Sequence, residues 1–167
     1  MGYEDHMKHA IRNVTCAVIT VSDTRTPGDD TSGQIIIKGL ESSGHEVREY
    51  LIVPDSLVAI RAAISRLLEE DSIKVIITNG GTGIARRDVT VEAVEPLLEK
   101  KLEGFGEIFR FLSYQEIGPA AIMSRAMAGM SSRKIIICLP GSSGAVRMAM
   151  EKIILPQIGH MVLEAEK

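Results

Sequence analysis

The sequence predicts an α/β fold with a mostly parallel central sheet that helices cover on both faces. Two observations carry this prediction. Apolar runs rich in Val and Ile alternate along the chain with segments whose apolar residues recur every three or four positions. The apolar runs also lack polar alternation, which is typical of strands buried on both faces. The 167 residues suit one domain, expected over residues 13–167 after a polar extension over residues 1–12.

The first half of the chain contains two predicted strand–helix units. A strand is expected at residues 15–21, a continuous β-branched apolar run, and a second at residues 47–53, which Pro54 ends. A helix is expected over residues 31–43, ended by Gly44, and a second from Asp55 or Ser56 to about residue 70. The residues expected to face inward are Ile35, Ile36 and Leu40, then Leu57, Ile60, Ile64, Leu67 and Leu68.

The second half continues the alternation. Strands are expected at residues 74–78 and 134–139. Helical patterns cover residues 90–98, 105–115, 118–127 and 143–155, and the last resumes after Pro156.

Composition excludes several classes of protein. The net charge is -3 and aromatic residues make up 4% of the chain with no Trp, which argues against a nucleic-acid binder. No apolar run approaches the roughly 20 residues of a membrane helix, so we expect a cytoplasmic protein. Cys16 and Cys138 lie in apolar strands and are expected to be buried thiols, and the four histidines have no zinc-ligand spacing.

The segments that leave the predicted strands gather most of the Gly, Ser, Thr and Asp residues. They cover residues 22–30, 54–56, 79–88 and 140–144. Ligands of parallel α/β sheets bind beyond the carboxyl ends of the strands, so these segments are expected to share one site.

A glycine-rich loop at residues 78–83 (TNGGTG) follows the third strand. Its backbone N–H groups could approach a phosphate closely, although an ordinary glycine-rich turn explains it equally well. The loop is no dinucleotide fingerprint, because Arg86 stands where the third glycine belongs, and the chain has no Walker A lysine.

Charged residues follow this loop directly. Arg86 and Arg87 suit a phosphate, and Asp88 suits Mg²⁺ that bridges phosphates. The simpler alternatives are a solvated arginine pair and a helix cap, and a cap is equally open to Asp55. For the Pro140-Gly141-Ser142 segment, a turn with a serine cap is the better explanation when the segment is taken alone.

Taken in order, these motifs resemble the MoaB/MogA family of molybdenum cofactor biosynthesis proteins, MoaB branch. The resemblance rests on VSDTR at 21–25, PD at 54–55, NGGTG at 79–83, ARRDVT at 85–90, FGE at 105–107, SRA at 124–126 and LPG at 139–141. It implies a three-layer α/β/α fold, a homotrimer or homohexamer, and contacts with other proteins of cofactor biosynthesis. It also implies adenylylation of molybdopterin by ATP with Mg²⁺, releasing pyrophosphate.

The resemblance also implies roles for individual residues. Asp55 and Asp88 look like the two critical aspartates, catalytic and metal-binding. The residues that would bind the nucleotide or the pterin are Ser22, Thr78, Gly80, Gly81, Thr82, Gly83, Arg87, Ser124, Pro140, Gly141 and Ser142. Ser143 departs from the proline that many relatives carry two positions after the glycine of the LPG loop. A non-catalytic molybdopterin carrier or an oligomeric scaffold is therefore the alternative function.

Overall fold

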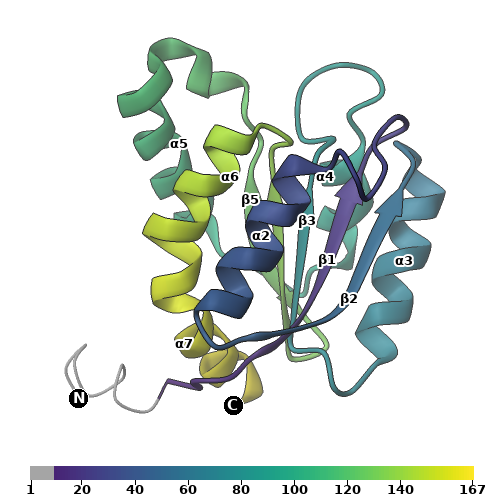
Figure 1. The fold of residues 1–167 in the computed structure, drawn as a ribbon, viewed down its shortest axis with the longest axis vertical. Helices are drawn as coiled ribbons and strands as arrows, with labels where there is room; N and C mark the ends of the chain where they lie inside the picture. The colour runs from purple at the N-terminus through teal and green to yellow at the C-terminus, as the bar shows by residue number, and fades with distance from the viewer. Residues whose placement is uncertain (1–9) are drawn as a thin grey trace.

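The computed structural model describes residues 10–167, and it contains one six-stranded sheet between two layers of helices (Figure 1). The strand order is β2-β1-β3-β6-β5-β4. The first four strands in that order are parallel, β5 pairs antiparallel with β6, and β4 pairs antiparallel with β5. The predicted three-layer fold with a mostly parallel sheet is confirmed. The expected extension over residues 1–12 lies mostly outside the described residues.

The elements alternate as the periodicity indicates. The strands are β1 (Thr15–Val21), β2 (Glu46–Val53), β3 (Val75–Asn79), β4 (Lys100–Lys101), β5 (Met127–Ser131) and β6 (Lys134–Leu139). The α-helices are α2 (Thr31–Ser42), α3 (Leu57–Glu69), α4 (Thr90–Val94), α5 (Glu103–Ile117), α6 (Ser143–Ala149) and α7 (Leu155–Glu166). Short 3₁₀ segments η1 (Glu95–Leu97) and η2 (Gly118–Met123) and a π-helical segment η3 (Met150–Ile154) complete the set.

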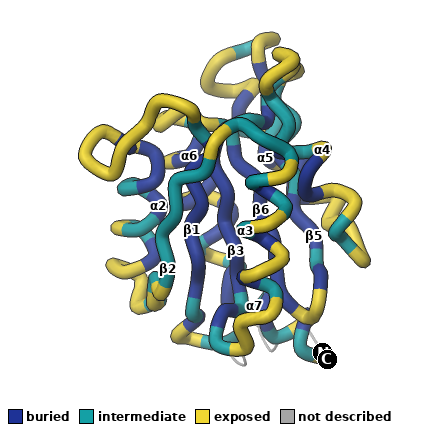
Figure 2. Tube along the Cα trace, turned by 90° about the vertical axis from the view of Figure 1, so that its right-hand side faces the viewer, coloured by how far each residue is buried: buried dark blue, intermediate teal, exposed yellow. Residues whose placement is uncertain are grey.

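The core lies on both faces of the sheet, because successive residues of a strand point to opposite sides. Cys16 and Val18 of β1 pack with α2, α5, α6 and α7, whereas Ala17 and Ile19 pack with α3 and α4. Strands β3 and β6 are therefore buried along their whole length, and exposed residues lie in the connecting loops and on the outer faces of the helices (Figure 2). Both cysteines are buried free thiols, as expected. Among the described residues, no helix is long and apolar enough to cross a membrane.

The predicted helix over residues 118–127 is wrong in its second half. Only Gly118–Met123 is helical, as a 3₁₀ segment, and Met127–Ser131 forms strand β5 beside β6. Ala128 and Gly129 give this segment little strand propensity, so its pairing with β6 determines its conformation. A Cβ on Gly129 would lie 2.6 Å from the carbonyl oxygen of Lys100, which explains the glycine.

The C-terminal helical region runs through Pro156 without a break. The irregularity lies earlier, where η3 widens the helix to a π-helix between α6 and α7. Pro156 stands in the first turn of α7, directly after the π-helical segment η3.

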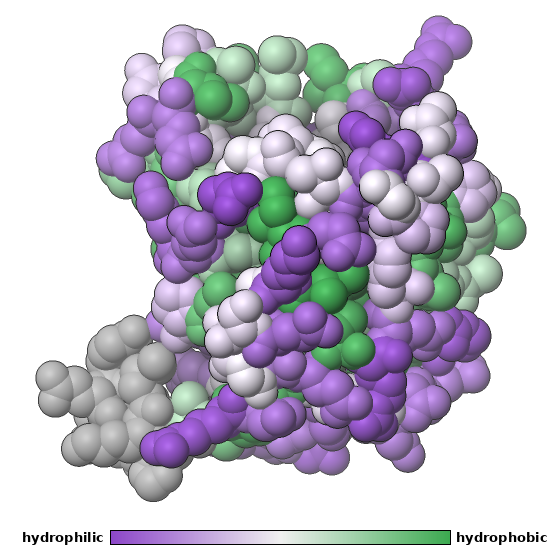
Figure 3. Space-filling view, in the orientation of Figure 1, coloured by the Kyte–Doolittle hydropathy of each residue, from purple (hydrophilic) through white to green (hydrophobic). Residues whose placement is uncertain are grey.

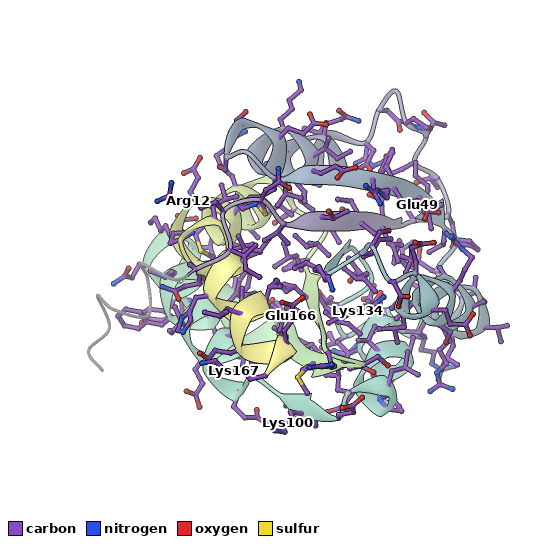
Figure 4. All side chains as sticks on the ribbon, turned by 90° about the horizontal axis from the view of Figure 1, so that it is seen from below. Arg12, Glu49, Lys100, Lys134, Glu166 and Lys167 are labelled. Atoms are coloured by element: carbon purple, nitrogen blue, oxygen red, sulfur yellow. The ribbon has the colours of Figure 1, made fainter. Side chains whose placement is uncertain are left out.

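Figure 4 views the molecule from the end where the parallel strands begin. This end lies opposite the loops that follow the carboxyl ends of the strands. There Lys134 of β6 is buried, and its Nζ donates to the carbonyl oxygens of Leu67 and Glu70 at 3.1 and 2.5 Å. Burial lowers the pKa of this lysine. Lys134 closes the carboxyl end of α3, where a cation is favourable, so it serves the fold.

Candidate functional site

The loops that leave β1, β3 and β6 surround a hollow of about 550 Å³, here called the large hollow. It is lined by Thr20, Val21, Ser22, Thr24, Arg25, Asp30, Thr31, Ser32, Asn79, Gly80, Gly141, Ser142 and Ser143. Helices α2 and α6 both begin at this hollow, so the positive ends of their dipoles face it. The volume and the polar lining suit a small polar ligand with anionic groups.

Gly80 and Gly81 form the turn after β3, and both have positive φ, at 98° and 68°. A Cβ on Gly80 would lie 2.3 Å from the carbonyl oxygen of Val21, so the ends of β1 and β3 could not approach. A Cβ on Gly81 would lie 2.3 Å from Oγ1 of Thr90. Thr90 holds the turn by donating from its hydroxyl to the carbonyl of Gly80 at 2.8 Å. The fold thus requires both glycines, whatever they do for a ligand.

A second hollow of about 180 Å³ adjoins the first and shares Val21, Ser22 and Thr24 with it. We call it the acidic hollow, because its other lining residues are Asp23, Asp55, Asp88, Arg87 and Gly81. It lies where the loops after β1, β2 and β3 meet.

Charge in the acidic hollow is incompletely neutralised. Burial raises the pKa of Asp55, and the carboxylates of Asp23 and Asp88 raise it further, while Arg87 lowers it. The backbone N–H of Asp55 donates to the Asp23 carboxylate at 3.0 Å, which holds these two loops together. A hollow with this surplus of negative charge favours a cation.

Asp88 does not cap the helix that follows it. The N-cap of α4 is Val89, which makes no side-chain capping bond. The Asp88 carboxylate instead accepts from the backbone N–H of Ala85 at 2.9 Å, which closes the loop that ends the glycine-rich segment. The cap expected at Asp55 is supplied by Ser56, whose Oγ accepts from the N–H of Ala59 at 3.4 Å. Neither aspartate is needed as a helix cap.

One of the residues that line the large hollow, Asp30, has a buried carboxylate. Asp30 is 3% exposed and caps α2 by accepting from the N–H of Gly33 at 3.0 Å. Its other oxygen accepts from the hydroxyls of Thr20 and Tyr50, both at 2.5 Å. The Asn79 amide donates to Oγ1 of Thr20 at 2.9 Å, so this network joins the ends of β1, β2, β3 and α2.

Comparison with known proteins shows the family of the chain. Residues 17–160 match the family described as "Probable molybdopterin binding domain". The chain belongs to the MoaB/MogA family. It is 52% identical over 170 residues to Molybdenum cofactor biosynthesis protein B of Staphylococcus aureus (strain COL), and the match covers 100% of both chains. It is 49% identical over 168 residues to the protein of that name from Bacillus subtilis (strain 168), covering 100% and 99%.

Solved structures of the MoaB/MogA family have the same fold. A crystal structure of Molybdenum cofactor biosynthesis protein B is 48% identical, with a TM-score of 0.90, and the match covers 92% of this chain and 96% of that one. The tungsten cofactor synthesizing protein MoaB from Pyrococcus furiosus is 39% identical, with a TM-score of 0.84 and coverage of 95% and 100%.

The residues that the family resemblance singled out fall into two groups. Those that line one of the two hollows are Ser22, Gly80, Gly81, Gly141, Ser142, Asp55, Asp88 and Arg87. Those that line neither are Thr78, Thr82, Gly83, Ser124 and Pro140. Thr78 and Thr82 are buried, because the strand and its turn direct them into the protein. The Ser124 hydroxyl accepts from the N–H of Ala126, two residues along its own segment.

Some residues of the large hollow were not named among the expected ligand-binding residues. Asp30 and Asn79 lie in segments that were expected to share one site, whereas Ser32 lies outside them. The Ser32 hydroxyl donates to the carbonyl of Gly141 at 2.7 Å. Asp30 stands directly before a helical pattern, which is a usual N-cap signal, and it does cap α2. Its bond to Tyr50 has no signal in the sequence, because twenty residues separate them.

The protein could supply only some of the ligands of a metal ion in the acidic hollow. Within residues 10–167, no group of three or more His, Cys, Asp or Glu side chains lies close enough to hold a metal by itself. Mg²⁺ commonly binds one or two carboxylates and takes its other ligands from phosphates and water. The oxygen donors of Asp55 and Asp88, in a hollow where negative charge is in surplus, fit that pattern.

Proposed function

We propose that this protein acts in molybdenum or tungsten cofactor biosynthesis by transferring the adenylyl group of ATP to molybdopterin. The observation that carries the proposal is the pair of adjoining hollows at the carboxyl edge of the sheet. One is large and polar, and the other holds Asp55, Asp88 and Arg87. Membership of a molybdenum cofactor biosynthesis family gives the substrate class.

The proposed reaction joins two phosphates. An oxygen of the terminal phosphate of molybdopterin attacks the α-phosphorus of ATP and forms a new P–O bond. The bond from that phosphorus to the bridging oxygen of the β-phosphate breaks, and pyrophosphate leaves with the electron pair. The attacking phosphate is already ionised at neutral pH, so no general base is needed, and catalysis consists of alignment and charge stabilisation.

The residues of the chain supply the alignment. Bound Mg²⁺ would offset charge on the phosphates, with Asp55 and Asp88 as its protein ligands. The guanidinium of Arg87 lines the same hollow and suits a phosphate oxygen. Ser142 and Ser143 stand at the start of α6, where backbone N–H groups and the helix dipole favour an anion.

The proposal includes assembly into a homotrimer or homohexamer. Large apolar side chains are exposed on α5 and η2: Ile108, Phe111, Tyr114, Ile117, Ile122 and Met123, at 51–80% exposure. Hydrophobic atoms are visible along the top of the molecule in Figure 3, where α5 ends and η2 follows. An apolar surface of this kind is typical of a protein interface. Light scattering across a dilution series should give a multiple of 18.1 kDa, and a monomer mass throughout would contradict assembly.

The activity is tested by incubating the protein with molybdopterin, ATP and Mg²⁺. We expect pyrophosphate and adenylylated molybdopterin in equal amounts. The control replaces ATP with α,β-methylene-ATP, whose corresponding bond cannot break, and it should give neither product. Tight molybdopterin binding without pyrophosphate release from ATP would refute the transferase function and favour the carrier function. The sequence argument for a carrier is Ser143, which lines the large hollow and stands where many relatives have proline.

A further inference from the structure

Arg125 lies in the segment between η2 and β5, and its guanidinium reaches the glycine-rich loop from about forty residues away in the sequence. Its Nε donates to the carbonyl oxygens of Thr82 and Gly83 at 3.2 and 3.0 Å. Its Nη2 donates to the carbonyl of Gly83 at 2.6 Å and to that of Asp88 at 3.1 Å. One planar group therefore holds both ends of the loop formed by residues 82–88.

The loop depends on this contact, because its own internal bonds are few. The Asp88 carboxylate accepts from the N–H of Ala85, and the N–H of Asp88 donates to the carbonyl of Ala85 at 2.9 Å. The four residues of the tip, 84–87, are all exposed. The orientation of the Asp88 carboxylate toward the acidic hollow thus depends on the hydrogen bonds by which Arg125 holds both ends of the loop.

The guanidinium is itself fixed from the other side. Arg125 forms an ion pair with Glu92 of α4, and both of its terminal nitrogens contact that carboxylate. The Arg125 side chain is 32% exposed. A lysine could not reproduce this arrangement, because a single ammonium cannot meet three carbonyls and a carboxylate in one plane.

We infer that Arg125 is a positioning residue, which locks the loop of residues 82–88 so that Asp88 stays directed at the acidic hollow. Arg125 lines neither hollow, so it acts through Asp88 and touches no substrate. The identity of the ligand that Asp88 binds in the acidic hollow rests on the proposed function. The locking of the loop by Arg125 does not depend on that function.

The first test measures the loop itself. In the full-length protein, hydrogen exchange of the amides of Ala85 and Asp88 is compared between wild type and Arg125→Met. We expect exchange at least about tenfold faster, the change that losing one net hydrogen bond of ordinary strength would produce. Trypsin should also cut faster after Arg86 and Arg87.

The matched control is Arg110→Met. The Nη1 of Arg110 donates to the carbonyl of Ala126 at 3.1 Å, so this variant loses an arginine–carbonyl contact nearby without touching the loop. Exchange of the loop amides should stay at the wild-type rate. Equal loop exchange in wild type and folded Arg125→Met would overturn the inference. If Arg125→Met does not fold, Arg125→Lys and Glu92→Gln carry the same comparison.

The second test uses the proposed reaction. In Arg125→Lys, the Mg²⁺ concentration for half-maximal turnover should rise about tenfold, while the Kd for molybdopterin stays within about twofold, since one lost contact shifts an equilibrium by that order. Slower turnover with an unchanged Mg²⁺ dependence would overturn the positioning role. If the wild-type protein releases no pyrophosphate, the proposed function fails, and the exchange measurement still decides the role of Arg125.

Discussion

Replacing Asp30 by alanine should destabilise the protein strongly, because this carboxylate is the acceptor for three donors in a nearly closed site. It accepts from the N–H of Gly33 and from the hydroxyls of Thr20 and Tyr50. Burial raises the pKa of the Tyr50 hydroxyl, and its bond to Asp30 raises it further, so the phenol stays a donor.

The magnitude follows from the three lost bonds. Loss of the helix cap costs about 1 kcal/mol, and each hydroxyl bond to the charged acceptor costs at least about 1.5 kcal/mol. The free energy of unfolding should therefore fall by about 4 kcal/mol, which lowers Tm by roughly 12 °C in a chain of this size. Tyr50→Phe removes one of the three bonds and should cost about 1.5 kcal/mol.

Urea denaturation followed by circular dichroism, at one fixed protein concentration, measures these free energies. The matched control is Asp29→Ala, which removes the neighbouring exposed aspartate, whose carboxylate accepts from the backbone N–H and the hydroxyl of Thr26. That variant should lose less than about 1 kcal/mol. Equal losses for Asp29→Ala and Asp30→Ala, or a loss below about 1 kcal/mol for Asp30→Ala, would refute the reasoning.

Three other predictions concern charge and backbone strain. Asp88→Asn keeps an acceptor for the N–H of Ala85, so the melting temperature should change little. The rate of single-turnover pyrophosphate release should fall about 100-fold, while molybdopterin binding persists. Full activity of this variant would exclude a metal role for Asp88. Asp55→Asn should raise Tm at pH 7. The raised pKa of Asp55 means that its ionisation destabilises the fold, so the gain should vanish below pH of about 3.9, and a gain independent of pH would contradict this cause. Ser132 and Arg133 have φ of 50° and 61° in the β5–β6 turn. Changing them to Asn and Gly should raise the free energy of unfolding, measured by urea denaturation, by about 1 kcal/mol. An unchanged denaturation midpoint would show that the turn is not strained.

Much of the architecture could be predicted because it depends on local patterns. Uninterrupted β-branched runs specify the buried parallel strands β1, β3 and β6, whereas β2 is a partly exposed edge strand. Each of the four predicted strands is found within one residue of its expected bounds. Asp55 and Asp88 were placed at one edge because carboxyl ends of parallel strands meet there. Both do line the acidic hollow.

The remainder depended on contacts between distant segments. Strand β5 contains Ala128 and Gly129, which favour no strand by themselves, and it exists because β6 offers a free edge. The hairpin turn of Ser132 and Arg133 carries no glycine or asparagine, so the usual signal for such a turn is absent.

The sequence by itself determined the class of fold, the edge of the sheet at which the candidate site lies and the family to which the chain belongs. Only the tertiary structure decided which side chains meet there. Arg125 reaches the glycine-rich loop, and Tyr50 reaches Asp30, across long separations in the sequence. Helical and strand periods specify which face a residue lies on, but they do not specify which distant residue it will meet, since that depends on how the elements pack.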